Sequence, residues 1–526
     1  MSQNPAIRPA PIRHAPIRHA LAVKRADDFA QWYQAVVAEA DMAEESGVRG
    51  CMVIKPWGYG IWERIQKLLD AEIKATGHDN CYFPLFIPLS YFEKEAAHVE
   101  GFAKEMAVVT HHRLISDGQG GLVPDPAAKL EEPLVVRPTS ETVIGAAMAR
   151  WVQSWRDLPL LTNQWANVVR WEMRTRMFLR TTEFLWQEGH TAHADRADAM
   201  EETLRMLEVY RAFAEGPLAM PVIVGEKPAN ERFPGADATY SIEAMMQDGK
   251  ALQAGTSHYL GTTFAEAAGI RYQDREGAQA LCHTTSWGVS TRMIGGVIMT
   301  HGDDDGLRVP PQIAPWQVVI LPMLRENDGD TALLAYCEGL KRELAAQTAL
   351  GEPVRVLLDK KPGKATAKRW AWVKKGAPLI LEIGGRDAES GQVSVLRRDR
   401  LWRADAKPDF QGVARDAFLA AAGATLEAIQ SALFEEARDR RDANIRRDIT
   451  TLDELAAFYH EDAQFPGWVE LSWSRPEGAA LEAVDTKLKA LKLTIRNTPL
   501  GGEAVSGTCP FTGEPAVERI YVARAY

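Results

Sequence analysis

The chain has 526 residues, of which 46% are hydrophobic, 8% aromatic and 25% charged. One hydrophobic core stops growing well below this length, so we expect about three domains and exclude a single small binding module. The composition excludes a disordered or fibrous protein, and no long apolar run has the length of a membrane span. The formal net charge of −10 argues against a polyanionic partner unless the charge is unevenly distributed.

The N-terminal stretch is basic, lacks acidic residues and has no apolar signal core. Its tandem PIRHA repeat, at residues 11–15 and 16–20, predicts a disordered low-complexity tail over residues 1–23, with a transit peptide as the alternative. The cysteines are scattered without CxxC spacing, which is typical of a reducing compartment and predicts a cytoplasmic protein. They are Cys51, Cys81, Cys282, Cys337 and Cys509.

The first predicted domain covers residues 24–311 and mixes helical and strand patterns, as an α/β (α+β) multidomain enzyme does. An amphipathic helix is expected between Gly60 and Gly77, and Pro84 and Pro88 predict an extended edge segment after it. The apolar residues at helical spacing are Ile61, Ile65, Leu68, Leu69 and Ile73.

Two further domains follow. A proline-rich connector at residues 308–315 precedes apolar runs separated by helices, which predicts a βαβαβ domain with a parallel core over residues 312–412. A charged helical stretch from about residue 416 to 448 then leads into a smaller α+β domain, residues 413–526.

The stretch from Asn167 to Ala194 is the most informative. If VVRWEM is a strand, Arg170 and Glu172 share one face, where a guanidinium could bind a carboxylate or phosphate; an ordinary salt bridge is the alternative. Aromatic, acidic and imidazole side chains alternate in the same way on FLWQEGH, at Trp186, Glu188 and His190. Buried charge needs a partner, so this pattern favours a pocket.

Four other segments carry polar clusters. RPTSET, with Thr139 and Glu141, has a helix N-cap as its alternative reading, and the segment with Gln253, Thr256 and His258 has a hydrogen-bonded turn. Arg292 precedes an apolar helical run, where a lone arginine is usually solvated. Three consecutive aspartates in HGDDDG, residues 301–306, do not share one side of a helix or strand, so a solvated turn is favoured over a metal loop.

The order of these segments resembles the class II aminoacyl-tRNA synthetases, and specifically the prolyl-tRNA synthetases of archaeal and eukaryotic type (type 3). The Gly60 helix resembles motif 1, which builds the dimer interface in that class; Arg170 and Glu172 match the RxE of motif 2, and Arg292 matches motif 3. RPTSET, WQEGHTAH and HTTSWG resemble the family's proline-pocket segments. The likeness runs from about residue 24 to the end.

The resemblance implies a class II antiparallel-sheet catalytic domain, an anticodon-binding domain and a small C-terminal domain. It implies a homodimer that uses ATP and Mg²⁺ to make prolyl-adenylate and charges tRNA(Pro), with no membrane partner. Arg170 would bridge the proline carboxylate and the α-phosphate, Glu172 would hold the adenine amino group, and Arg292 would bind the γ-phosphate or stack near the adenine. The implied ATP-binding residues are Arg170, Glu172, Arg180, Gln253, Thr256 and Arg292. Arg180 is preferred to Arg174 and Arg176 as the second arginine of the motif 2 loop. The implied proline-binding residues are Thr139, Glu141, Arg170, Trp186, Glu188, His190, His258, Ser286 and Gly288.

Two departures from the family pattern carry predictions. About ninety residues separate WQEGH from HTTSWG, which leaves no room for the editing insertion of the bacterial-type enzymes. The C-terminal domain keeps Cys509 but has Thr512 and Ser474 at the positions of zinc-binding cysteines, so we expect no structural zinc.

The basic stretch at residues 360–386 suits phosphate contacts to tRNA, through Lys364, Lys368 and Arg369. The family's chain end folds back toward the catalytic domain, which makes a role for Tyr526 a hypothesis. The rival hypotheses are a paralogue that charges another amino acid and a noncatalytic nucleic-acid-binding protein that inherited the fold.

Overall fold

The computed structural model describes residues 19–93, 106–325, 329–460, 466–502 and 505–526. The contacts divide the chain into two compact units: one joins the N-terminal stretch up to Asp41 to Gly302–Leu433, and the other joins Met42–His301 to Phe434–Tyr526. Most of the predicted PIRHA tail lies outside the described residues. The three-domain partition stays a prediction, but the contacts group residues 434–526 with residues 42–301.

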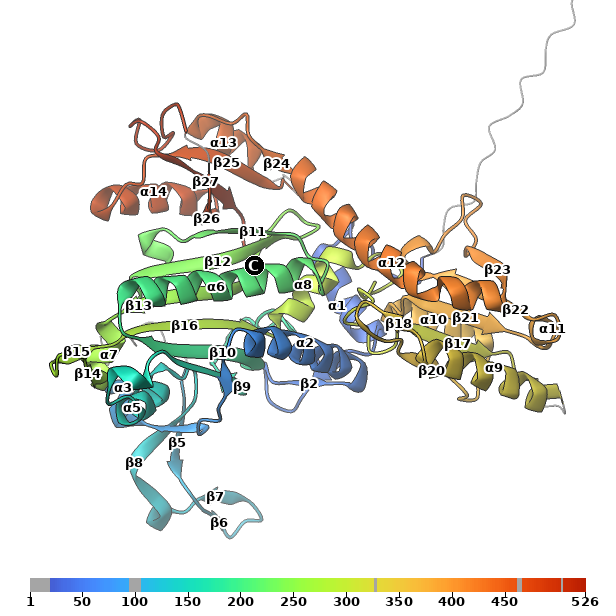
Figure 1. Ribbon diagram of the computed structural model, residues 1–526, viewed down its shortest axis with the longest axis horizontal. Coiled ribbons are helices and arrows are strands. Elements are labelled where there is room, and N and C mark those ends of the chain that lie inside the picture. Colours follow the sequence, from blue (N-terminus) through green and yellow to red (C-terminus); the bar gives the residue numbers. More distant parts are fainter. Residues whose placement is uncertain (1–18, 94–105, 326–328, 461–465, 503–504) are drawn as a thin grey trace, which may run out of the picture. The chain divides into compact units, whose positions relative to one another are not determined.

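An 11-stranded sheet organises the second unit (Figure 1). Its neighbours pair antiparallel throughout except at the two edges, where β3–β9 and β24–β25 are parallel. This confirms the predicted antiparallel sheet. In sheet order the strands are β24 (Ile445–Arg446), β25 (Trp468–Trp473), β27 (Glu518–Ala523), β26 (Thr494–Pro499), β11 (Val222–Glu226), β12 (Ala238–Met245), β13 (Ala251–Gly261), β16 (His283–Ser290), β10 (Glu183–His193), β9 (Leu160–Val169) and β3 (Asp79–Asn80).

The C-terminal strands continue the main antiparallel sheet. Strand β26 pairs antiparallel with β11 through Gly225 opposite Pro499 and Glu226 opposite Thr498. The sequence pattern had separated these segments into two domains, because pairing between strands more than 250 residues apart leaves no local signal.

Helices cover this sheet. The predicted amphipathic helix is α2 (Pro56–Ala75), which buries Ile61, Ile65, Leu69 and Ile73. Helix α6 (Arg196–Glu215) packs along β13 and β16 on one face of the sheet, as Figure 1 shows. The other helices of the unit are α3 (Leu89–Glu93), α5 (Glu141–Trp151), α7 (Thr263–Ala268), α8 (Arg292–His301), α13 (Leu452–Phe458) and α14 (Gly478–Ala490).

Smaller strand pairs surround the main sheet. The predicted extended edge segment contains β4 (Phe86–Pro88), which pairs with β8 (Lys129–Val136), and β8 also pairs with β5 (Ala107–His111). The remaining pairs are β1 (Ala43–Glu45) with β2 (Met52–Ile54), β6 (Leu114–Ser116) with β7 (Leu122–Pro124), and β14 (Arg271–Gln273) with β15 (Gln279–Leu281).

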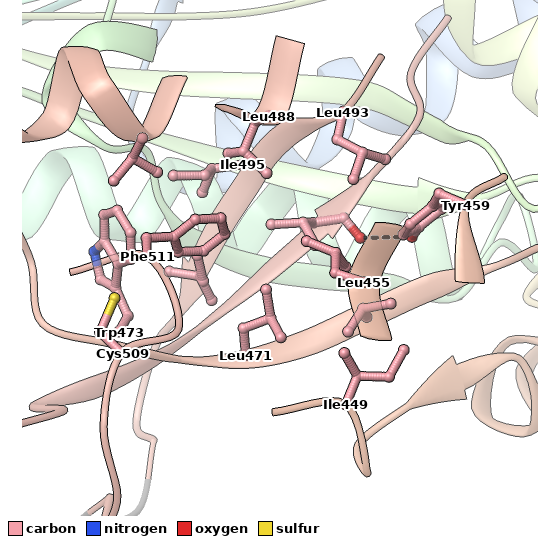
Figure 2. Packing of buried hydrophobic residues seen from close by; sticks show 14 of the residues in the cluster. Ile449, Leu455, Tyr459, Leu471, Trp473, Leu488, Leu493, Ile495, Cys509 and Phe511 are labelled. Atoms are coloured by element: carbon pink, nitrogen blue, oxygen red, sulfur yellow. Dashed lines mark hydrogen bonds between the residues drawn. The ribbon is translucent and has the colours of Figure 1, made fainter. Parts of the chain in front are cut away.

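The C-terminal segment has a hydrophobic core of its own beside the sheet. Figure 2 shows Trp473, Phe511 and Cys509 together at one end of this cluster and Tyr459 at the other. The Tyr459 hydroxyl donates to the Val522 carbonyl at 3.1 Å, so the buried ring has its polar atom satisfied.

The first unit confirms the predicted βαβαβ order. Its parallel core has β20 (Val356–Leu358), β17 (Val318–Pro322) and β21 (Leu379–Ile383), and β22 (Gln392–Arg397) and β23 (Phe410–Ala414) extend it antiparallel. The helices are α9 (Gly329–Ala345), α10 (Ala365–Lys375), α11 (Gly385–Glu389) and the part of α12 (Arg415–Ala443) up to Leu433, and a β18–β19 pair (Thr348–Ala349, Glu352–Pro353) follows α9.

The start of the described chain also belongs to this unit. Helix α1 (Phe29–Glu39) packs against α10, and Lys374 and Lys375 pair with Glu39 and Asp41. Residues 24–41 were expected in the catalytic domain, so here the contacts differ from the expected boundary.

The prediction of a turn at HGDDDG is confirmed, because Asp304 and Asp305 form a turn between the paired Asp303 and Gly306, but the prediction that it is solvated is wrong. Asp303 accepts two hydrogen bonds from the Arg398 guanidinium, and Asp305 is only 1% exposed. Asp305 accepts from the Ala20 amide at 2.7 Å and from the Trp402 indole at 2.6 Å. Both carboxylates have partners from distant segments, which residue spacing alone could not reveal.

Among the described residues, α12 alone passes the length and hydropathy test for a membrane span. Its buried side chains recur at helical spacing and face the core, as in a packed helix of a folded domain. The apolar ones are Phe418, Leu419, Ala422, Leu426, Ile429, Leu433 and Ala437.

Candidate active site

Three neighbouring strands, β10, β16 and β13, present polar side chains on the sheet face opposite α6. Because side chains alternate along a strand, residues paired across neighbouring strands point to the same face. Ser257, one step out of phase, instead donates to the Thr203 carbonyl of α6. The front face carries two rows, Glu188–Gly288–Thr256 and His190–Ser286–His258.

These rows form the floor of a cavity of about 270 Å³. Its lining contains every residue that was predicted to bind proline. It also contains Gln253, Thr256 and Arg292, which were predicted to bind ATP. An adjoining cavity of about 170 Å³ is lined by Glu172, Arg180, Arg170 and Arg292. Arg170 and Arg292 line both cavities, so the two sets of predicted residues meet at these arginines.

Gly189 is required by the packing behind the floor. A Cβ at this position would lie 2.0 Å from the Trp287 ring, on the paired residue of β16. Any side chain at Gly189 would displace Trp287 and with it the strand that carries Ser286 and Gly288.

A buried carboxylate, Glu188, lies at the centre of the cavity floor. It is 3% exposed and accepts from Gln164 at 2.5 Å, from His190 Nε2 at 3.0 Å and from the Ser140 hydroxyl. Burial alone would raise the pKa of Glu188, but the bonds from His190, Ser140 and Gln164 hold it below its ordinary value. Glu188 is therefore ionised and held in one orientation at the cavity floor.

The two histidines of the floor have opposite protonation. Burial lowers the pKa of His190, but Glu188 outweighs that effect and raises it, which makes a His190–Glu188 ion pair. For His258, desolvation and the like charge of His190 lower the pKa to about 3, so this ring is neutral. Its Nδ1 lies 3.0 Å from the Thr239 hydroxyl.

The RPTSET segment starts α5, as the capping alternative proposed, but its side chains do not cap. Ser140 is the N-cap residue without a side-chain bond to the helix, because its hydroxyl donates to Glu188. The Thr139 hydroxyl donates to Glu141, and both residues line the cavity. The segment therefore serves the site.

The expected strand at VVRWEM is wrong, because β9 ends at Val169. Arg170 lies just beyond it, donates from Nε to the Pro138 carbonyl at 2.9 Å and stands over the Trp186 ring. Glu172 accepts from the Arg174 amide at 2.7 Å and pairs with Arg180 at 3.3 Å. The residues still converge, although a loop places them.

Arg292 begins α8 and is not the solvated arginine of the alternative reading. Desolvation lowers the pKa of Arg292 to about 10, the like charges of Arg170 and Arg180 add to this effect, and Glu243 opposes it. Arg292 therefore stays charged at neutral pH. Arg170, Arg180 and Arg292 repel one another electrostatically, and a bound anion would relieve this repulsion.

Sequence reasoning missed a loop that closes one side of the main cavity. Glu231, Arg232 and Phe233, between β11 and β12, line it. The Phe233 ring packs against His258 with 4.9 Å between centroids. The loop has no periodicity or motif, and the single aromatic residue beside a charge pair was its only signal.

The chain end returns to the same unit of the molecule. Tyr526 donates its hydroxyl to Asp248 at 2.6 Å, and its amide bonds to the Ala251 carbonyl at the start of β13. Arg176 and Lys250 stand over its ring.

The predicted tRNA contacts divide in the first unit. Lys364 is exposed, but Lys368 pairs with Asp359 at 3.2 Å and Arg369 with Glu382 at 3.1 Å, and both side chains are largely buried. The geometry therefore leaves Lys364 available to a phosphate and assigns the other two an internal role.

The fold and this site define a class II aminoacyl-tRNA synthetase. Residues 127–301 match the class II core domain of the G, H, P, S and T tRNA synthetases, and residues 317–420 match the anticodon-binding domain.

The chain belongs to the proline–tRNA ligase family. It is 78% identical over 507 residues to the proline–tRNA ligase of Novosphingobium aromaticivorans, covering 96% of this chain and 98% of that one. It is 71% identical to the enzyme of Erythrobacter litoralis, with 96% and 99% covered. A crystal structure of the Cryptosporidium parvum prolyl-tRNA synthetase complexed with L-proline and AMP matches with a TM-score of 0.84 at 33% identity, covering 96% of this chain and 97% of that one.

Proposed function

We propose that the joined cavities activate L-proline with ATP, forming prolyl-adenylate and pyrophosphate, and pass the prolyl group to the 3′ end of tRNA(Pro). The main support for this proposal is the position of Arg170, which lines both cavities and lies between a carboxylate-rich end and an arginine-rich end. Attack of a carboxylate on the α-phosphorus needs positioning and charge stabilisation more than an enzymic nucleophile. Arg170 supplies both where the two reactants meet.

The proline end suits a small zwitterion. The secondary ammonium of proline offers two N–H donors, and Thr139 and Glu141 supply acceptors at the cavity wall. Trp186, His190 and His258 enclose the ring together with Glu188, Ser286 and Gly288. Such packing excludes small apolar rivals poorly, so alanine or cysteine is expected to be activated at a low rate.

The nucleotide end suits adenine and polyphosphate. Arg180 and Arg292 would bind phosphates, Glu172 would accept from the adenine amino group, and Gln253 and Thr256 would complete the site. Mg²⁺ prefers oxygen ligands and is commonly held through substrate phosphates, which fits a site where the described residues contain no cluster of three or more His, Cys, Asp or Glu able to hold a metal. Gln253 has an amide oxygen to offer, and the ion would neutralise phosphate charge.

We also propose that the enzyme has no editing insertion. Residues 194–282, between β10 and β16, are described throughout and build α6, β11, β12, β13, α7 and the β14–β15 pair, so they are used by the synthetase core itself. The use of this whole segment for the core, together with the match to the Cryptosporidium enzyme, favours a prolyl-tRNA synthetase of archaeal and eukaryotic type. Hydrolysis of alanyl-tRNA by the purified chain would contradict it.

We further propose that the C-terminal segment binds no structural zinc. The residues at the expected site are Cys509 and the hydroxyls of Ser474 and Thr512, which lie 2.9 Å apart. Zinc needs four sulfur, imidazole or carboxylate ligands, and one thiol with two hydroxyls does not fit. Stoichiometric zinc in the purified protein would overturn this part.

Partners follow from the same proposal. The anticodon-binding domain would dock tRNA(Pro), with Lys364 as a phosphate contact. A homodimer is favoured by exposed apolar side chains near the motif 1 helix and on the β6–β7 hairpin, including Tyr59, Leu114 and Leu122. We place the enzyme in the cytoplasm, as for other synthetases of this kind.

The test is amino-acid-dependent ATP–pyrophosphate exchange, run with all twenty amino acids, followed by charging of tRNA(Pro). Proline is expected to support exchange far above the others. Stronger exchange with another amino acid would favour a paralogue, and no exchange with any would favour the noncatalytic hypothesis.

A further inference from the structure

A buried charge cluster next to the nucleotide end has no part in the chemistry above. Glu243 of β12 is fully buried, and its two carboxylate oxygens have different cationic partners. Lys227 Nζ lies 2.9 Å from Oε1, and Arg496 donates to Oε2 from Nη2 at 2.8 Å and from Nε at 3.1 Å. Lys227 is 2% exposed and Arg496 5%.

Two strand irregularities bring these groups together. The pairing of β12 with β13 shifts between Ile242 and Glu243, and the pairing of β26 with β27 shifts between Ile495 and Asn497, which leaves Arg496 as the extra residue. A β-bulge redirects a side chain, and bulges are enriched beside active sites. Here the bulge directs an arginine of the C-terminal segment onto a carboxylate of the catalytic sheet.

The cluster adjoins residues assigned to ATP. Glu243 is paired with Gln253 on β13, and Gln253 lines the main cavity. Glu243 and Arg496 also act on Arg292, in opposite directions: Glu243 raises its pKa and Arg496 lowers it. The cluster therefore contributes to the electrostatic field at the phosphate site.

The charge balance gives that field a sign. Two cations and one anion leave a net charge of +1, on groups that water does not screen. Burial alone would raise the pKa of Glu243, but Arg496 and Lys227 hold it below its ordinary value, so the anion is present at neutral pH. Loss of either cation leaves a neutral pair in place of a positive cluster.

We propose that Arg496, a residue of the C-terminal segment, is a positioning residue of the nucleotide site: by neutralising Glu243 it keeps the phosphate end positive and Arg292 directed to ATP. The inference rests on the proposed function. It gives the C-terminal segment, for which no structural zinc was expected, a positioning role at the active site, and it links that segment to ATP rather than to proline.

The test is steady-state ATP–pyrophosphate exchange by single and double variants, with KM measured separately for ATP and proline. Arg496→Met is expected to raise the KM for ATP about tenfold and leave the KM for proline within about twofold. Arg496→Lys keeps the charge and should restore most of the affinity. The matched control is Arg475→Met, which removes a half-exposed C-terminal arginine paired with Glu518 and should change neither KM.

Variants that change the cluster's charge in opposite directions distinguish an electrostatic effect on ATP binding from structural damage. Glu243→Gln removes the anion and keeps both cations, so its KM for ATP should not rise. The double variant Glu243→Gln/Arg496→Met restores a net charge of +1 through Lys227 alone and should return the KM for ATP to within about threefold of wild type. If Arg496→Met does not fold, as judged by circular dichroism, Lys227→Met makes the same charge change and should raise the KM for ATP alike.

The inference is overturned if Arg496→Met leaves the KM for ATP unchanged, or if Arg496→Met and Glu243→Gln both weaken ATP and proline equally. Absence of proline-dependent exchange in the wild-type chain contradicts the proposed function instead. The two failures are therefore distinguishable in one set of assays.

Discussion

The two ends of the active-site cavity hold charge in opposite ways. At the proline end, Glu188 is already bound by Ser140, Gln164 and His190, so its charge is balanced before any ligand arrives. At the nucleotide end, Arg170, Arg180 and Arg292 gather with Glu172 as the one carboxylate among the lining residues of the smaller cavity. A small zwitterion is thus met by a preorganised, neutralised wall, and a polyphosphate by excess positive charge.

The largest effect is expected where the two ends meet. Arg170→Ala should lower kcat/KM for exchange about 10³-fold, because one group is assigned to both the proline carboxylate and the α-phosphate. The measurement is exchange at varied proline and varied ATP, where both substrates should be affected. Loss confined to one substrate would break the comparison at its centre.

The preorganised end can be tested with matched serine variants. Ser140→Ala removes a donor to the buried Glu188 and should raise the KM for proline about tenfold, with little effect on ATP. Ser257→Ala removes a buried hydroxyl that faces α6 and should change stability alone. Equal KM changes in the two variants would mean that the Glu188 network is structural.

The chain end tests the nucleotide side more gently. Removing Ala525 and Tyr526 frees Arg176 and Lys250 from the tyrosine ring, and exchange should fall about fivefold. Tyr526→Phe keeps the ring and loses only the bond to Asp248, so it should retain most activity. An unchanged rate after truncation would remove the role proposed for the chain end.

The smallest effect concerns pH and stability. The pKa of His258 is lowered from 6.5 to about 3 in the folded protein, so the unfolded chain binds more protons between these values and stability falls as pH falls through that window. Because the ring borders an open cavity, we expect it to account for about 1 kcal/mol between pH 7 and 5. Urea unfolding of wild type and His258→Asn should show this difference, and identical pH dependence would contradict a neutral, desolvated ring.

What the sequence predicted well rests on strand periodicity. Trp186, Glu188 and His190 share a face because side chains alternate along β10. Thr256 and His258 follow the same rule on β13, although a hydrogen-bonded turn was the alternative prediction for that segment. The βαβαβ order of the first unit was visible because its strands are continuous apolar runs.

What it missed depends on partners far away in the chain. Asp303 and Asp305 looked solvated because Arg398 and Trp402 lie almost a hundred residues on. Lys368 looked available to tRNA because its partner Asp359 carries no motif. Arg170 and Glu172 line one cavity, as the sequence predicted, but a loop beyond the end of β9 positions them and not a strand, and their role at the site stays a prediction.

The most direct test of the central claim is calorimetric titration of two variants with each substrate alone. Glu188→Gln should lose affinity for proline and keep that for ATP, whereas Arg292→Ala should lose affinity for ATP and keep that for proline. If each variant weakens both ligands by the same factor, the cavity does not have two electrostatically distinct ends, and the account is contradicted.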